Sequence, residues 1–142
     1  MDRNVEMLNS IYQNASMASQ SIETLLPKVD YPDLNSSLSH QQSVYNSIAS
    51  HASQLLYDYD NQPKDTNPIE RAALWAGVQL NSLFDSSPSH IAQMVIDGSK
   101  MGVTDMSKRM MEYYGCDKPV EGLANELMTY EQASMEELKR FL

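Results

Sequence analysis

The sequence predicts an all-α protein in which four long helices form two antiparallel helical hairpins, joined by a long crossover that carries one short extra helix. Three observations support this prediction. Apolar residues recur every three or four positions over long stretches, as they do in helices with one buried face. The six prolines stand between these stretches and never inside them. A chain of 142 residues is long enough to bury a core as one domain, which we place at 1–142.

The first predicted hairpin consists of helices at about 3–26 and 33–61. The inward row of its first helix is predicted to comprise Val5, Leu8, Tyr12, Ala15, Ser19, Ile22 and Leu26. The inward row of its second helix is predicted to comprise Leu34, Leu38, Gln41, Tyr45, Ile48, Ala52, Leu55 and Tyr59. With a rise of about 1.5 Å per residue, each helix would be roughly 35 to 40 Å long, which is typical of four-helix bundles.

The crossover is predicted to carry a short helix at about 68–84. Its start is indicated by Asn67-Pro68, with Glu70 in the capping-box position. Its apolar residues lie on several faces, which is more than one packing contact needs. Two interpretations stay open: the segment is buried between the bundle and a loop, or it forms a homodimer contact through Leu74, Trp75 and Val78.

The second predicted hairpin consists of helices at about 88–114 and 119–142. Its first helix is expected to begin at Ser87-Pro88, because Ser can cap the free amides of the first turn and Pro has no amide to leave unpaired. The same helix is expected to end before Gly115, which can take the left-handed conformation that closes a helix. The two helices are therefore joined by a short turn and lie antiparallel.

Two glycines and two acids mark the inner face of this hairpin. Gly98 and Gly102 lie on that face with a four-residue spacing, which predicts a close approach of a neighbouring helix. Glu131 lies at the margin of the inward row of the last helix. That row is predicted to comprise Val120, Leu123, Ala124, Leu127, Tyr130, Ser134, Leu138 and Phe141. Counting from the turn places Asp105 and Glu131 at similar heights, so we expect the two acids to approach each other inside the bundle.

Charge and cysteine content exclude several classes of function. The chain has 19 acidic and 10 basic residues and a formal net charge of −9, which repels nucleic acid and anionic membranes. Cys116 is the only cysteine, so no internal disulfide can form and a reducing compartment is favoured. No run of about eighteen apolar residues occurs. We therefore expect a cytoplasmic protein without a signal peptide or membrane span.

The order of these elements resembles the ferritin-like superfamily, whose four helices form two hairpins joined by one long crossover. More narrowly, two segments resemble small uncharacterised ferritin-like proteins of bacteria. These are Ser-Pro-Ser-His-Ile-Ala-Gln-Met-Val-Ile-Asp-Gly-Ser-Lys-Met-Gly at 87–102 and the closing segment 127–142. Members of the superfamily that act as iron stores, oxidases or catalases hold two metals between the helices. The resemblance implies a site built from a Glu on each of two helices and Glu-x-x-His on each of the other two.

The standard metal motif of that superfamily is missing from this chain. The three histidines are His40, His51 and His90, and none has Glu three residues before it. Where the motif would stand in the last helix, the chain has Glu131-Gln132-Ala133-Ser134, which keeps an acid and lacks the imidazole. The first hairpin offers only neutral groups at the matching height: Tyr12, Ser16, Ser19, Gln41 and Tyr45. Two divalent ions need several carboxylates and imidazoles, so we expect no di-iron site and no cofactor.

Two interpretations of Asp105 and Glu131 stay open. In the first, one or both acids are partly solvated or accept hydrogen bonds from Tyr12, Tyr45 and Ser134, since buried polar groups are normally paired. In the second, they form a residual site for one iron or manganese ion. The ten methionines, five of them on the helix at 88–114, are expected to fill the core, although thioethers also bind Cu(I) and promiscuous partners.

The sequence therefore favours a non-catalytic ferritin-like bundle that acts as a structural or interaction module, with a homodimer as one form of self-association. No hydrolase motif and no phosphate-binding glycine loop is present. The alternative is a metal-binding or redox protein with an atypical site around Asp105 and Glu131. The biological process, the partner and the oligomeric state are left open.

Overall fold

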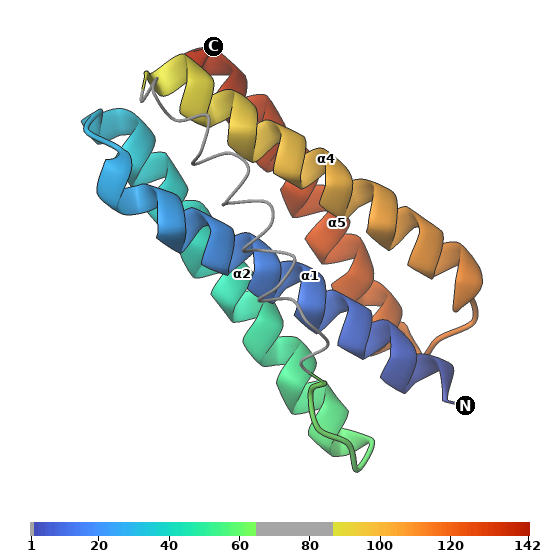
Figure 1. The fold of residues 1–142 in the computed structure, drawn as a ribbon. Helices are drawn as coiled ribbons and strands as arrows, with labels where there is room; N and C mark the ends of the chain where they lie inside the picture. Colours follow the sequence, from blue (N-terminus) through green and yellow to red (C-terminus); the bar gives the residue numbers. More distant parts are fainter. Residues whose placement is uncertain (1, 65–86) are drawn as a thin grey trace.

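A computed structural model of the chain describes residues 2–64 and 87–142 (Figure 1). These residues form four α-helices and two short 3-10 turns, with no strand among them, so the all-α prediction is confirmed for this part of the chain. The predicted helix at 68–84 lies outside the described residues, as do Leu74, Trp75 and Val78. The elements are α1 (Arg3–Leu25), α2 (Pro32–Asp58), α4 (Pro88–Glu112) and α5 (Lys118–Leu138), with 3-10 turns at Leu26–Lys28 and Lys139–Phe141.

The first hairpin, α1 and α2, is set by local capping and by prolines. Asp2 caps α1 by accepting a hydrogen bond from the Asn4 backbone amide at 2.8 Å. Pro27 cannot donate a backbone hydrogen bond, so the chain leaves the α-helix there in a 3-10 turn. Pro32 then occupies the first turn of α2, where its missing amide costs nothing.

The second hairpin, α4 and α5, begins as its sequence predicts. The Ser87 side chain accepts a hydrogen bond from the His90 amide at 3.3 Å and so caps α4. The helix ends at Glu112, two residues before the predicted boundary, because Tyr113 leaves helical geometry. Gly115 then adopts φ +80°, a left-handed conformation that a side chain would make strained, and the chain reverses into α5.

The two hairpins pack side by side into one bundle (Figure 1). Each helix contacts its hairpin partner most extensively, while α1 also packs against α4 and α5, and α2 against α5. The start of α1 lies beside the α4–α5 turn. There, Arg3 Nη1 donates to the Tyr114 carbonyl oxygen at 3.5 Å and the Asp117 amide donates to Asn4 Oδ1 at 2.7 Å. These contacts fix the first hairpin against the turn of the second.

The core runs along the axis of the bundle and is built from the inward rows of all four described helices. Its largest fully buried side chains are Tyr45, Leu8, Ile11, Ile22, Leu25, Leu34, Leu38, Ile48, Leu56, Ile91, Met106 and Leu123. Several of these positions follow from the predicted periodicity. Burial of this apolar surface is the main force that holds the hairpins together.

Candidate functional site

A group of buried polar side chains interrupts the apolar core near the middle of the bundle. We call Gln41, Tyr45, Ser99, Glu131 and Ser134 the core polar cluster; their exposed fractions are 0, 1, 8, 3 and 2% respectively. They come from α2, α4 and α5 and therefore from both hairpins. Among the residues that the structure describes, Glu131 is the one Asp, Glu, Lys, Arg or His side chain that is buried. This makes the cluster the first candidate for a functional site.

Helical periodicity places these polar residues in the interior. Gln41 and Tyr45 lie one turn apart on α2, on the face that also carries the buried residues Leu38 and Ile48. Glu131 and Ser134 lie in the same way between the buried leucines of α5. Because the apolar neighbours must be buried, the polar side chains are buried with them.

Gly102 on α4 makes room for the Glu131 carboxyl group. A Cβ atom built on Gly102 would lie 3.0 Å from the Glu131 Cδ atom and would overlap Glu131 Oε2. The sequence predicts the close approach of a neighbouring helix at this glycine, but the atoms that occupy the space beside Gly102 belong to a side-chain carboxyl group of α5. Any side chain at position 102 would displace it.

Electrostatics keep this carboxyl group neutral at pH 7. Burial raises the pKa of Glu131 to about 8, with a further upward contribution from the negative charge of Asp105. Glu131 Oε1 has no hydrogen-bond partner among the described residues. A protonated acid of this kind can donate one hydrogen bond and accept others.

Tyr45 reaches from the first hairpin toward the second. Its ring packs edge-to-face on Tyr130, with centroids 5.4 Å apart and planes at 83°. Burial raises the pKa of the Tyr45 phenol, the charge of Glu131 raises it further, and the facing hydroxyls of Ser134 and Ser99 lower it. The Ser134 and Ser99 hydroxyls lie near the Tyr45 phenol without forming a hydrogen bond to it. Within the described part of the chain, Tyr45 Oη therefore has no hydrogen-bond partner. The phenol therefore stays protonated and neutral.

Asp105, the second predicted acid, lies at the edge of the core and is already engaged. Asn14 Nδ2 on α1 donates to Asp105 Oδ2 at 2.8 Å, and Arg109 Nε lies 3.7 Å from Asp105 Oδ1. The two acids lie close enough for Asp105 to raise the pKa of Glu131. The structure thus brings the predicted pair near each other, but only Glu131 is buried.

Asp105 is partly solvated, as one interpretation of the sequence expects, with 29% of its side chain exposed, whereas Tyr45 and Ser134 were wrong as predicted hydrogen-bond partners of the acids. In the described residues Tyr45 and Ser134 bond to neither acid, and Asp105 is held by Asn14 and Arg109. The four-residue spacing of Asp105 and Arg109 was a signal in the sequence for the ion pair. Asn14 lies beside the predicted inward row of α1, and only the rotation of that helix turns it toward α4.

The described residues do not fit the two-metal centre that the ferritin-like resemblance implies. Within 2–64 and 87–142, no three His, Cys, Asp or Glu side chains gather closely enough to hold an ion. His40 and His51 are exposed on α2, and His90 lies in the first turn of α4. A pair of divalent ions carries four positive charges, whereas the cluster offers one acid beside uncharged hydroxyl and amide groups, and the nearby carboxylate of Asp105 is already engaged.

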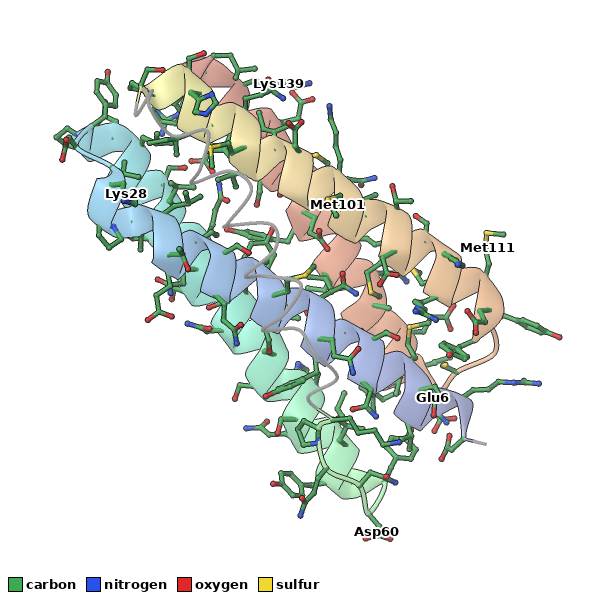
Figure 2. The ribbon with its side chains drawn as sticks, in the orientation of Figure 1. Glu6, Lys28, Asp60, Met101, Met111 and Lys139 are labelled. Atoms are coloured by element: carbon green, nitrogen blue, oxygen red, sulfur yellow. The ribbon has the colours of Figure 1, made fainter. Side chains whose placement is uncertain are left out.

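The methionines do not converge on one point either. Met94 and Met106 are buried in the core, whereas Met101 and Met111 on the same helix are 60 and 78% exposed. Figure 2 shows Met111 pointing away from the bundle near the end of α4. Met94 and Met106 therefore fill the core as expected, whereas Met101 and Met111 lie on the exposed side of α4 and do not.

Comparison with known proteins adds no relative: no family model, no curated protein and no solved structure matches this chain. The resemblance to the ferritin-like superfamily therefore rests on the order of elements and on the residues quoted above. Among the described helices, none combines the length and the apolar character that a bilayer crossing requires.

Proposed function

We propose that this chain is a ferritin-like bundle without catalytic metals, which acts as a structural or interaction module. The hairpin layout supports the first half of the proposal. The core polar cluster supports the absence of catalytic metals, because it offers hydroxyl and amide groups and a single buried acid at the place where a metal protein needs several negative charges. The observation that carries the proposal is the burial of Glu131, at 3% exposure, with no basic side chain buried beside it among the described residues and with Asp105 as the one nearby carboxylate.

A structural role gives the cluster a physical use. Tyr45 comes from the first hairpin, whereas Ser99, Glu131 and Ser134 come from the second. Apolar helix faces can slide or rotate past one another with small changes in free energy, but buried polar groups tolerate few alternative neighbours. The cluster would therefore favour one pairing of the two hairpins and give the module a defined surface.

Metal titration of the purified full-length chain tests this proposal. We expect no binding of Fe(II) or Mn(II) with micromolar affinity by anaerobic calorimetry, and no change in melting temperature when either ion is added. Stoichiometric binding that is lost in both Glu131→Gln and Asp105→Asn would contradict the proposal and support the alternative, a metal-binding or redox protein. Asp97→Asn is the matched control, because Asp97 is an exposed acid of α4 about two helical turns before Asp105.

An interaction module needs a partner, and a second copy of the chain is one candidate, beside the interpretation that the crossover segment is only buried within its own chain. The contact predicted through Leu74, Trp75 and Val78 lies outside the described residues and stays a prediction.

A further inference from the structure

Unpaired polar atoms are concentrated along one strip of the bundle interior. Six buried side-chain atoms of this strip have no hydrogen-bond partner among the described residues. They are Ser37 Oγ, Gln41 Nε2, Gln41 Oε1, Tyr45 Oη, Glu131 Oε1 and Ser134 Oγ. All five side chains are more than nine-tenths buried, and Gln41 is fully buried with both ends of its amide unpaired.

The strip has a defined geometry. Ser37, Gln41 and Tyr45 are spaced by four residues on one face of α2 and extend over about 12 Å of helix. Glu131 and Ser134 are three residues apart on one face of α5, which packs against α2. The Tyr45 phenol lies near Ser134 and Glu131 of α5. The unpaired atoms therefore lie on the faces of two helices that pack together, and Tyr45 brings the two groups near each other.

A row of buried polar atoms lowers the stability of a protein unless each atom has a hydrogen-bond partner. A buried donor or acceptor without a partner loses its bonds to water and gains nothing in return. The protein interior is close-packed, and native structures leave few such groups unpaired. Six of them on two facing helices therefore indicate an occupant that forms hydrogen bonds.

The chemistry of the strip selects the class of occupant. The Gln41 amide can donate and accept hydrogen bonds, and so can each hydroxyl group of the strip. No Lys, Arg or His is buried among the described residues, so the strip has no cation that would bind an anion. We propose that the strip from Ser37 to Glu131 binds an uncharged hydrogen-bonding occupant that has both donors and acceptors. Two sources share this chemistry: a file of ordered water molecules, or one small neutral polar molecule such as an amide or a polyol.

Replacement of Gln41 tests whether the strip is occupied. Met has nearly the same shape as Gln and cannot pair with the occupant. If the strip is occupied, Gln41→Met in the full-length chain should lower the melting temperature by about 3 to 10 °C, because hydrogen bonds to the occupant are lost. If the strip is empty, the same change should leave the melting temperature unchanged or raise it, because an unpaired amide has been removed. Gln54→Met, at an exposed position of α2, is the control and should have little effect.

Two measurements on the wild-type chain identify the occupant. Native mass spectrometry followed by denaturing extraction detects a small molecule that remains with the folded protein. Rotating-frame Overhauser spectroscopy detects water held beside the Gln41 side-chain amide. A fall in melting temperature together with either signal supports the proposal and separates its two sources. An unchanged or raised melting temperature, or a fall with neither signal, would overturn it.

Discussion

Raising the pH should destabilise this protein through the buried carboxyl group of Glu131. Its pKa is about 8 in the folded state and takes the ordinary value of 4.5 in the unfolded state. Below pH 4.5 the acid is protonated in both states, and its full contribution to stability is present. Between pH 4.5 and 8 the unfolded chain releases a proton that the folded chain keeps, so the free energy of unfolding falls. Above pH 8 both states are ionised and the contribution is lost.

The size of this effect follows from the difference in pKa. A difference of 3.5 units, from 4.5 to 8, multiplied by about 1.36 kcal/mol per unit gives about 5 kcal/mol. Native domains have a total free energy of unfolding of about 5 to 15 kcal/mol, so a loss of this order is readily measured. The titratable groups that face Glu131 are Asp105 on α4 and Tyr45 on α2. The Tyr45 phenol is neutral across this window.

The assay is urea denaturation of the wild type and of Glu131→Gln, followed by circular dichroism from pH 5 to pH 9. The Gln variant keeps a neutral side chain at every pH. We expect its free energy of unfolding to rise relative to that of the wild type by several kcal/mol across this range. Glu126→Gln, at an exposed position on the same helix, should give a curve parallel to the wild type. A difference between wild type and Glu131→Gln that does not depend on pH would refute the reasoning.

Three further predictions follow from named contacts. Gly102→Ala should destabilise the protein by about 1 to 3 kcal/mol, because the new Cβ atom would overlap the Glu131 carboxyl group. Gly122→Ala is the control in the same denaturation assay. A Cβ atom at position 122 meets nothing within 4 Å, so this change should stabilise the protein by up to about 1 kcal/mol. Asp105→Asn removes a nearby negative charge and should lower the pKa of Glu131, measured by carbon-13 NMR of the carboxyl group; an unchanged pKa would show that burial alone sets it. Light scattering at high concentration decides between the two interpretations of the segment around Trp75: a homodimer that Trp75→Asp dissociates would support the dimer contact, and a wild-type monomer would end the dimer hypothesis.

The sequence by itself determined the helices and much of what lies inside them. Regular apolar spacing, capped starts and prolines between the stretches are local signals, and they predict helices without reference to distant residues. The same periodicity placed Gln41, Tyr45 and Ser134 on inward faces, and the structure buries all three. Counting residues from the turn also placed Asp105 and Glu131 near one another.

Only the tertiary structure decided how these side chains meet. Asn14 holds Asp105, Ser99 faces Tyr45, and the Glu131 carboxyl group occupies the space above Gly102. Each of these contacts depends on how far one helix is rotated about its axis and on its height relative to its neighbour. An error of one residue in the predicted register moves a side chain by about 100° around the helix axis. Periodicity along a single helix carries no information about the rotation of its neighbour. Which groups are neutral, engaged or unpaired in the core is therefore a property of the packed bundle and not of any one helix.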